Sequence, residues 1–449
     1  MCGIISIIDQ EDRPVPESEL QQALALVQHR GPDGQGQYFG PNFALGHQRL
    51  AIIDLSEQGR QPMTYQGMVV TYNGELYNYI ELREELRQKG YTFRTESDTE
   101  VLLAAYHHWG PECVQHFNGM WAFVLYDPHN NRIFCSRDRY GIKPLYYARI
   151  GQRFCLASEI KQLRAIAGWT AQLNPLRAYE FLVKGYHDHT DQTLFKGVKQ
   201  LRGGQNILYD LDCHCHSIQT YYQPNATAPL LSTSFAAQCE QFHGLLLDAV
   251  RLRLRADVKV GTALSGGLDS SSIATLMHRL LQAQNAQEQQ EAVSSCFDDP
   301  RFDEQEYIDT LVQQKAIRSH KVFPDFDQLR EELDQLQWQQ DEPVASASVY
   351  AQYCVFRMSK AKGLTVMLDG QGADEILGGY EKFYTLYFKT LLRQAPWQLP
   401  VALFRFATLH NPAKLLRLAR NKYSATKVQA RWLQPKFLPP QERHFSRSS

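Results

Sequence analysis

Short apolar runs that lead into loops of small polar residues are the main pattern in the second half of the chain. Residues 258–264 combine branched and small apolar side chains, as a buried strand does, and apolar side chains return at helical spacing over residues 273–277. Between them, residues 265–271 read Ser-Gly-Gly-Leu-Asp-Ser-Ser. The pattern therefore predicts a strand, a loop and a helix in direct succession.

This succession predicts an anion-binding site. Glycine lets the backbone approach a phosphate closely, and a helix N-terminus offers free N–H groups and the positive end of its dipole. The carboxylate of Asp269 would repel phosphate unless a metal ion lay between them, and Mg²⁺ prefers one or two carboxylates together with phosphate oxygens. The loop therefore predicts a nucleotide bound with Mg²⁺. It is not a Walker A loop, because no Gly-Lys-Ser/Thr follows. A simpler alternative is that Asp269 or Ser270 only caps the helix.

Two more apolar runs, residues 292–297 and 364–368, predict further strands, and the second leads into Asp-Gly-Gln-Gly-Ala-Asp-Glu at residues 369–375. Open α/β sheets bind ligands at the carboxyl ends of their parallel strands. We therefore expect both glycine-rich loops to lie at that edge, with Asp374 as a second carboxylate for Mg²⁺ beside Asp269. The alternative for Asp374 is again a helix cap.

The first half opens on Cys2, which is followed by an apolar run at residues 3–8 that is typical of a buried strand. The small second residue permits removal of Met1. The thiol would then lie beside a free α-amine with an ordinary pKa of about 7.7–8.0. One residue would supply both a nucleophile and a base. The alternative is a buried structural cysteine at the start of a strand.

Length and composition narrow the function classes. A chain of 449 residues predicts two or three domains, and 43% hydrophobic with 21% charged residues is ordinary for a globular protein. The net charge of −1 gives no electrostatic reason to expect nucleic acid or a membrane as partner. No apolar run has the length of a membrane span, and the N-terminus lacks the features of a secretory signal. Nine scattered cysteines predict free thiols in a reducing cytoplasm.

Four motifs give Cys2 its context. Residues 29–34 read His-Arg-Gly-Pro-Asp-Gly, residues 45–54 read Leu-Gly-His-Gln-Arg-Leu-Ala-Ile-Ile-Asp, residues 72–78 read Tyr-Asn-Gly-Glu-Leu-Tyr-Asn, and residues 97–100 read Ser-Asp-Thr-Glu. With Cys2, their order and spacing closely resemble a class II (N-terminal nucleophile) glutamine amidotransferase domain. The resemblance implies a four-layer αββα fold of the Ntn-hydrolase type.

The same resemblance implies roles for individual residues. Cys2 would attack the side-chain amide of glutamine and form a thioester. The oxyanion would be held by the side chain of Asn73 and the backbone N–H of Gly74. The glutamine pocket would be formed by Arg49, Ile53, Glu75 and Asp98, with Arg49 at the α-carboxylate and the two acids at the α-ammonium. Simpler alternatives are a type I′ hairpin turn at Asn73-Gly74 and a capping box from Ser97 to Glu100.

The loop at residues 265–271 resembles the pyrophosphate loop of ATP enzymes that adenylate a substrate. With Asp341-Glu342-Pro343 and the second glycine-rich loop, the second half resembles the synthetase domain of glutamine-dependent asparagine synthetases. The implied reaction is attack of an aspartate carboxylate on ATP, release of pyrophosphate, and capture of glutamine-derived ammonia by the acyl-adenylate, with loss of AMP. The implied ATP and pyrophosphate residues are Leu264, Ser265, Gly266, Gly267, Asp269, Ser270, Cys296, Asp369 and Gly370, and the implied Mg²⁺ ligands are Asp269 and Asp374.

These patterns predict a glutaminase domain over residues 1–212, a linker over 213–234, and an α/β ATP domain with a parallel sheet over 235–449. Cys-His-Cys-His at residues 213–216 predicts a polar hairpin rather than a zinc site, because alternation on a strand cannot direct four successive side chains to one ion. The basic stretch at residues 414–431 predicts a solvated face.

Two departures from the family leave the function open. Gln371 stands where many asparagine synthetases carry a glutamate that could assist proton removal. Relatives also continue beyond Ser449, so we expect a C-terminally truncated member. The leading hypothesis is ATP-dependent transfer of glutamine-derived ammonia to a carboxylate, with aspartate as the first candidate. The alternatives are a glutaminase whose nucleotide half only binds or regulates, and an adenylating enzyme that closes a ring or couples a peptide. A homodimer is a further hypothesis.

Overall fold

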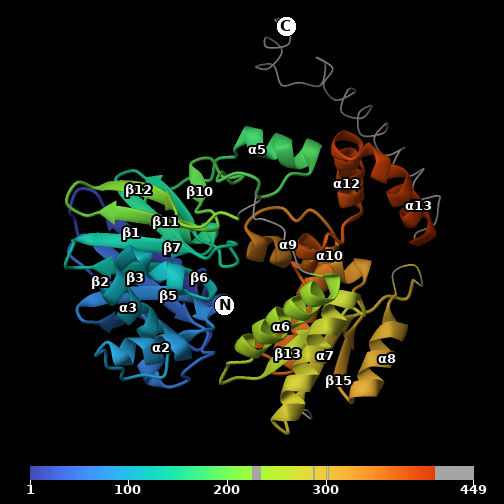
Figure 1. Cartoon of the computed structure of the whole chain (residues 1–449). Coiled ribbons are helices and arrows are strands. Elements are labelled where there is room, and N and C mark those ends of the chain that lie inside the picture. The colour runs from blue at the N-terminus through green and yellow to red at the C-terminus, as the bar shows by residue number, and fades with distance from the viewer. Residues whose placement is uncertain (225–233, 287–288, 300, 302, 410–449) are drawn as a thin grey trace, which may run out of the picture. The chain divides into compact units, whose positions relative to one another are not determined.

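The computed structural model describes residues 1–224, 234–286, 289–299, 301 and 303–409 (Figure 1). The chain divides into two compact units, Met1–Asp369 and Gly370–Ser449. The first unit contains three β-sheets with their covering helices, and the described part of the second is helical.

Two antiparallel six-stranded sheets form the N-terminal part of the first unit (Figure 1). The first sheet has the order β10 (Val198–Gln200), β8 (Tyr146–Ile150), β9 (Arg153–Ala157), β1 (Gly3–Asp9), β3 (Phe43–Arg49) and β2 (Gly34–Phe39). The second has the order β12 (Cys215–Thr220), β11 (Gln205–Asp210), β7 (Arg132–Arg137), β6 (Gly119–Asp127), β5 (Met68–Leu76) and β4 (Met63–Tyr65).

The alternation of side chains along β1 explains why the sheets stack. All seven residues of β1 are buried, as its apolar run predicted. Ile4 and Ile8 point into a core shared with residues of the second sheet, such as Val124, whereas Ile5 and Ile7 point to the other face and pack with α1. A strand that is buried on both faces needs a second sheet on one side and a helix on the other.

Helices cover the outer faces of both sheets. The helices of this part are α1 (Glu17–Ala25), α2 (Tyr79–Gln88), α3 (Asp98–Trp109), α4 (Cys113–His116) and α5 (Pro175–Tyr179). The first packs on the first sheet together with a 3-10 helix, η4 (Ile160–Ala165), while α2, α3 and α4 pack on the second sheet. The predicted αββα arrangement is confirmed.

The third sheet is parallel throughout, with the order β15 (Arg318–Val322), β14 (Glu291–Ser295), β13 (Val260–Ala263) and β16 (Val366–Leu368). Its helices are α6 (Phe235–Arg253), α7 (Leu268–Ala283), α8 (Gln305–Lys315), α9 (Phe326–Gln340) and α10 (Ser348–Ala361). Ala292 packs with α7 and α8, whereas its neighbour Val293 packs with α10, so helices cover both faces. The predicted α/β domain with a parallel sheet is confirmed.

The described part of the second unit consists of α11 (Ala373–Leu377), α12 (Glu381–Gln394) and α13 (Leu399–Leu409). The rings of Tyr384 and Phe406 meet edge to face at 4.7 Å and hold α12 against α13. The predicted solvated face at residues 414–431 lies outside the described residues.

The hairpin of β11 and β12 corrects two expectations. Strand β12 pairs with β11 along its whole length, from Asp210 opposite Cys215 to Gln205 opposite Thr220, so residues 215–220 belong to the second sheet and not to a linker. The polar hairpin is confirmed, but Cys213 and Cys215 form a disulfide, so the expectation of free thiols is wrong for this pair. Residues 225–233 of the predicted linker lie outside the described residues.

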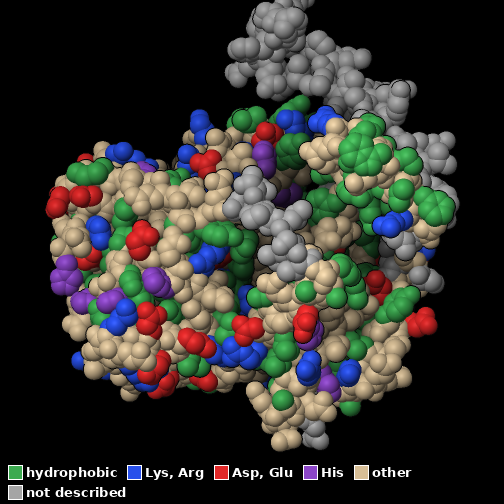
Figure 2. All heavy atoms as spheres, in the orientation of Figure 1, with side chains coloured by type: hydrophobic (Ala, Val, Ile, Leu, Met, Phe, Trp, Pro, Cys, Tyr) green, Lys and Arg blue, Asp and Glu red, His purple; other side chains and the backbone are tan. Residues whose placement is uncertain are grey.

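None of the described helices combines the length and apolar character that crossing a membrane requires. On the face shown in Figure 2, Lys and Arg side chains are interspersed with Asp and Glu side chains. This distribution agrees with the near-zero net charge of the sequence.

Candidate active site

Cys2 lies just before β1, where the pairing of Gly3 with Gln48 brings it to the end of β3. The backbone N–H of Leu50 donates to the Sγ atom of Cys2 at 3.3 Å, and the guanidinium Nε of Arg30 donates to its carbonyl oxygen at 2.8 Å. Burial raises the pKa of the Cys2 thiol, so it is protonated at neutral pH. The thiol therefore needs a base before it can act as a nucleophile.

The α-amine at the N-terminus of the chain has the properties that such a base needs. Burial lowers the pKa of the Met1 α-amine to about 5. An amine held in these surroundings is neutral at pH 7 and is able to accept a proton.

Asn73 and Gly74 lie inside β5, where they pair with Ala122 and Trp121 of β6. They do not form a hairpin turn, so that alternative is wrong. The Asn73 side chain is 1% exposed, and its Nδ2 atom has no hydrogen-bond partner among the described residues. A buried N–H without a partner costs about 1–3 kcal/mol, so this donor is well suited to a bound oxyanion.

Two buried carboxyl groups, Glu75 and Asp98, lie beside the end of β5. Asp98 is the first residue of α3, and its Oδ2 atom accepts from the Leu76 backbone N–H at 2.9 Å and from the Tyr72 hydroxyl at 3.0 Å. Burial raises the pKa of Asp98 to about 6. The pKa of Glu75 is raised well above its ordinary value, first by burial and then by the charge of Asp98. Two acids that destabilise each other's charge favour a cation between them, which suits the ammonium group predicted here.

Arg49 is the last residue of β3, and carbonyl groups of the loop that follows accept hydrogen bonds from its guanidinium. Its Nη1 atom donates to the Ser56 carbonyl at 2.9 Å and its Nη2 atom donates to the Asp54 carbonyl. A guanidinium has five N–H donors, so these two bonds orient the group and leave capacity for a carboxylate. Ile53, in the same loop, is 8% exposed.

Helix α3 also shows how local capping works at this site. The Ser97 hydroxyl accepts from the Thr99 N–H, as a cap does. The Glu100 carboxylate instead accepts from the N–H groups of Arg94 and Thr95. The predicted capping box is therefore only half formed, because Glu100 serves the preceding loop.

The two sheets bring these groups into one site. The charges of Glu75 and Lys143 both act on the pKa of Cys2. Lys143 is 6% exposed, and burial lowers its pKa while the charge of Glu75 opposes that effect. The sequence patterns did not predict that Arg30 and Lys143 belong to this site. The position of Lys143 between Ile142 and Pro144, inside an apolar stretch, is a signal that could have indicated a buried charge.

The loop after β13 has the predicted form. Gly267 is the N-cap residue of α7 and no side chain caps this helix, so the capping alternative for Asp269 and Ser270 is wrong. Instead the Ser270 hydroxyl closes the loop by accepting from the Ser265 N–H at 3.2 Å. Gly266 has a φ of +83°, and a Cβ there would lie 3.0 Å from the Glu304 carbonyl oxygen. The loop therefore requires glycine at residue 266.

The remaining predicted nucleotide residues of the first unit share one edge of the third sheet. Leu264, Cys296 and Asp369 directly follow β13, β14 and β16, which run parallel, so they lie at the carboxyl ends of these strands. Leu264 and Cys296 are each 1% exposed, and Asp369 accepts from the Gln352 side chain at 3.2 Å. The expected edge is confirmed for these three positions.

Gly370 and Asp374 belong to the second unit, where Asp374 lies in the first turn of α11. Gly372 is the N-cap residue of α11 and no side chain caps this helix, so the capping alternative for Asp374 is wrong too. The pairing of Asp374 with Asp269 stays a prediction. In the first unit, Asp269 offers a half-buried carboxylate in the first turn of α7, beside the glycine loop. That oxygen donor fits Mg²⁺ held together with phosphate oxygens.

The two sets of site residues lie in parts of the chain that match two different families of known proteins. Residues 1–222 match the family model of the glutamine amidotransferase domain, and residues 241–447 match the family model of asparagine synthase.

Three relatives illustrate the match along the chain. A protein of Methanocaldococcus jannaschii named "Putative asparagine synthetase [glutamine-hydrolyzing] 2" is 34% identical over 420 residues, covering 88% of this chain and 79% of that protein. "Asparagine synthetase [glutamine-hydrolyzing] 1" of Bacillus subtilis is 33% identical over 394 residues, covering 85% and 59%. "Amidase chry2" of Gibberella zeae is 31% identical over 416 residues, covering 85% and 60%. The chain thus spans about 60% of the length of two of these relatives. It belongs to the family of glutamine-hydrolysing asparagine synthetases.

Proposed function

We propose that the protein transfers ammonia from glutamine to a carboxylate at the expense of ATP, with aspartate as the acceptor and asparagine as the product. The observation that carries the proposal is a buried amide donor without a partner, Asn73 Nδ2, in the domain that holds the Cys2 thiol. Such a donor suits a tetrahedral intermediate. The family membership of the whole chain supports the joining of this chemistry to an ATP site.

In the first half-reaction, removal of Met1 would leave Cys2 with its own α-amine in the buried surroundings that keep the Met1 amine neutral. The amine would take the thiol proton as sulfur attacks the glutamine side-chain amide. Asn73 Nδ2 and the Gly74 N–H would hold the oxyanion, and collapse would release ammonia and leave a thioester. Water would then release glutamate and restore the thiol.

The glutamine would be oriented by groups of opposite charge at its two ends. Arg49 would bind the α-carboxylate, because its guanidinium is already fixed by the Ser56 and Asp54 carbonyls. Glu75 and Asp98 would bind the α-ammonium, and their charged forms would be stabilised by it. Ile53 would form part of the apolar wall.

In the second half-reaction, the acceptor carboxylate would attack the α-phosphorus of ATP and release pyrophosphate. Ammonia would then replace AMP on the acyl carbon. The N–H groups at the start of α7 and the hydroxyls of Ser265 and Ser270 would hold the leaving pyrophosphate. Mg²⁺, when bound, would neutralise phosphate charge, and Asp269 and Asp374 would be its protein ligands. Adenine would lie against the backbone near Cys296.

The acceptor and the setting of the reaction are part of the proposal. The names of two relatives specify asparagine synthetase, and that of the third specifies an amidase. Aspartate is therefore the first acid to test. Free thiols at seven cysteines of the described residues agree with a cytoplasmic location. A homodimer is open to test by size-exclusion chromatography with light scattering.

The test is an assay of the full chain with ATP, Mg²⁺, aspartate and glutamine, in which glutamate, asparagine, AMP and pyrophosphate are each measured. We expect Cys2→Ala to abolish glutamate release and glutamine-dependent synthesis while synthesis from added ammonia persists. Cys239→Ala, at an exposed cysteine of α6, is the matched control and should leave all four products unchanged. Absence of AMP with every tested acid would refute the synthetase reaction.

A second candidate is a glutaminase whose nucleotide half binds ATP without forming an acyl-adenylate. It is favoured by Gln371, because an amide cannot serve as the base that a glutamate could provide when ammonia attacks, so the last step of the synthetase reaction lacks that group. This candidate predicts Cys2-dependent glutamate release without pyrophosphate. Formation of asparagine in Gln371→Glu, where the wild-type chain forms none, would show that Gln371 blocks amide formation.

A further inference from the structure

A buried carboxylate from the part of the chain that matches asparagine synthase reaches into the glutaminase domain. Asp341 directly follows α9, and its side chain is 6% exposed. Its Oδ2 atom accepts from the Ile160 backbone N–H at 2.6 Å, and its Oδ1 atom lies 3.0 Å from the Nζ atom of Lys161. Asp341 thus holds the start of η4 by a backbone bond and an ion pair at once.

Lys161 continues the connection toward Cys2. Its ammonium is 3% exposed and also pairs with the Glu159 carboxylate. The other oxygen of Glu159 accepts from Nη1 of Arg30 at 2.7 Å, and Nε of the same guanidinium donates to the Cys2 carbonyl at 2.8 Å. We call Asp341, Lys161, Glu159 and Arg30 the charge relay. It joins α9 to the backbone of Cys2 without a gap.

The relay side chains are shielded from water, and Glu159 is held in its charged form. Burial alone would raise the pKa of Glu159, but hydrogen bonds from His29 and the charges of Arg30 and Lys161 lower it to about 2. All four relay side chains are at most 8% exposed. Lys161 lies between the carboxylates of Asp341 and Glu159, and Glu159 lies between Lys161 and Arg30, so a change at one end alters the charge balance at the next group.

Two features show that the end of α9 is held at this place. Asp341 has a φ of +63°, a region that few residues with a Cβ adopt. The Trp338 ring, one turn earlier, lies under the Lys161 ammonium at 5.7 Å and under the Arg164 guanidinium at 5.2 Å. The end of α9 is thus in contact with residues 160, 161 and 164 through both Asp341 and Trp338.

We propose that Asp341 is a positioning residue for Cys2: seated against Lys161, it fixes Arg30 on the Cys2 carbonyl and so couples glutamine hydrolysis to the placement of α9. The inference rests on the proposed role of Cys2 and deepens it. Displacement of α9 would remove one of the two carboxylates that hold Lys161, loosen Arg30 and slow the glutaminase. The ATP half would in this way control when ammonia is released.

The test compares Asp341→Asn, Lys161→Met and the double variant with the wild-type chain, in glutamate release without ATP. We expect kcat to fall between about twofold and thirtyfold in each single variant, the range of coupling through such networks. The KM for glutamine should stay within about twofold, because the relay contacts the Cys2 backbone rather than the predicted glutamine groups. The double variant should be no slower than the slower single variant, since both break one connection.

The double variant also keeps the test valid if a single variant folds poorly. It leaves neither member of the ion pair as a lone buried charge, which is the main cause of instability on breaking such a pair. The rate of Cys2 alkylation by iodoacetamide, followed by mass spectrometry, is a second readout. It should change in the same variants, because the Cys2 carbonyl is no longer held.

Glu342→Gln is the matched control. Its carboxylate lies next in sequence and accepts from the Leu194 backbone N–H, but it has no bond to the charge relay among the described contacts. It should keep wild-type kcat. An equal loss in Glu342→Gln, or wild-type kcat and alkylation in Asp341→Asn, would overturn the inference. If the wild-type chain shows no glutamate release that Cys2→Ala abolishes, the proposed function itself is wrong and the inference falls with it.

Discussion

Replacement of Asn73 by alanine separates catalysis from stability. The Asn73 Nδ2 atom is buried without a partner in the described structure, so its N–H groups contribute nothing to folding and carry an unsatisfied cost of about 1–3 kcal/mol. Alanine removes that cost, while the lost packing of the amide acts in the opposite direction. We expect the free energy of unfolding to change by less than about 1 kcal/mol.

The catalytic effect should be much larger. If Asn73 Nδ2 donates to the oxyanion, its removal should lower kcat for glutamate release by about 100- to 1000-fold, or about 2.7–4 kcal/mol of transition-state stabilisation. The KM for glutamine should change little, because the bond forms mainly in the transition state. Synthesis with added ammonia should be unaffected, since that reaction bypasses the thioester.

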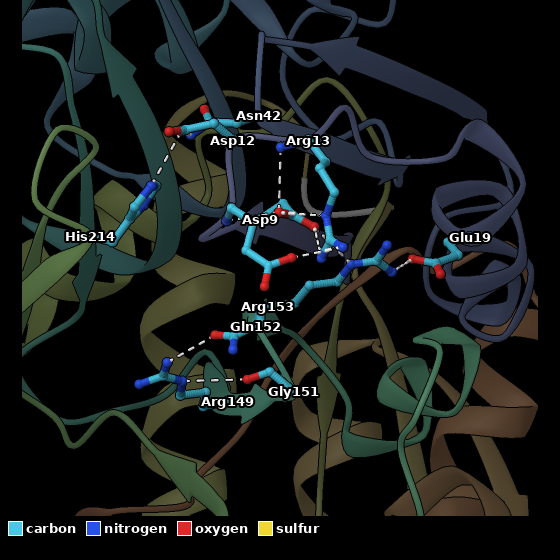
Figure 3. Close-up of polar contacts among 11 residues, drawn as sticks. Asp9, Asp12, Arg13, Glu19, Asn42, Arg149, Gly151, Gln152, Arg153 and His214 are labelled. Atoms are coloured by element: carbon cyan, nitrogen blue, oxygen red, sulfur yellow. Dashed lines mark hydrogen bonds and ion pairs between the residues drawn. The ribbon is translucent and has the colours of Figure 1, made fainter.

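Asn42→Ala is the matched control, because it removes a buried amide, 7% exposed, that has a partner. The Asn42 Nδ2 atom donates to the Asp12 carboxylate at 2.6 Å (Figure 3). Asn42 lies at the opposite end of β1 from Cys2, since Ile8 pairs with Phe43 and Gly3 with Gln48. This variant should lose about 1 kcal/mol of stability and keep wild-type kcat.

Both variants are measured by urea unfolding and by initial rates of glutamate release on the same preparation. A kcat for Asn73→Ala within about threefold of wild type would refute the oxyanion role. So would a loss of activity that matches a loss of folded protein. Asn73→Ala should lose more activity than Asn42→Ala, and Asn42→Ala should lose more stability than Asn73→Ala.

Three more outcomes are expected. Asp9→Asn should cost about 1.5–3 kcal/mol at pH 7, because the buried carboxylate loses its charged bonds to two arginines (Figure 3). The pKa of Asp9 is below its ordinary value, because hydrogen bonds from the Arg13 side chain and from the backbone N–H groups of Glu11 and Arg13 outweigh burial. In urea unfolding this difference should therefore be present above about pH 4 and shrink as the pH falls below that value; a difference that does not shrink would contradict it. Gly266→Ala should abolish pyrophosphate release and retain glutamate release, since a side chain would meet the Glu304 carbonyl at a φ of +83°; retained pyrophosphate release would show that the loop can rearrange. The kcat/KM for glutamine should fall with decreasing pH at a midpoint below the ordinary value of about 7.7–8.0 for the pKa of an α-amine, because burial lowers the pKa of an amine at this place, as it does for Met1; a midpoint near 8 would argue against this base.

Local chemistry made much of the site predictable. The loop at residues 265–271 combines glycines, hydroxyls and one carboxylate in a short stretch, so the strand, loop and helix could be read from neighbours in sequence alone. The apolar run after Cys2 likewise predicted a fully buried strand. The alternatives at Asn73, Asp269 and Asp374 were decided only by the observed pairing and capping.

Pairings between strands and between side chains were harder to predict from the sequence. Strand β12 and the disulfide between Cys213 and Cys215 depend on a turn that alternation alone does not specify. Arg30 and Lys143 were missed because their roles come from partners far away in sequence, namely the Cys2 carbonyl and the Glu75 carboxylate.

What the sequence alone determined is the set of reactive groups and the local elements that carry them, because nucleophile, loops and strand periodicity are encoded by residues within a few positions of one another. Only the tertiary structure decided which groups meet: that Asn73 Nδ2 is buried without a partner, that Lys143 acts on Cys2, and that Asp341 reaches Lys161. The physical reason is that burial and charge pairing are properties of the packed chain, and a residue's pKa or unmet hydrogen bond depends on neighbours that the sequence order does not name.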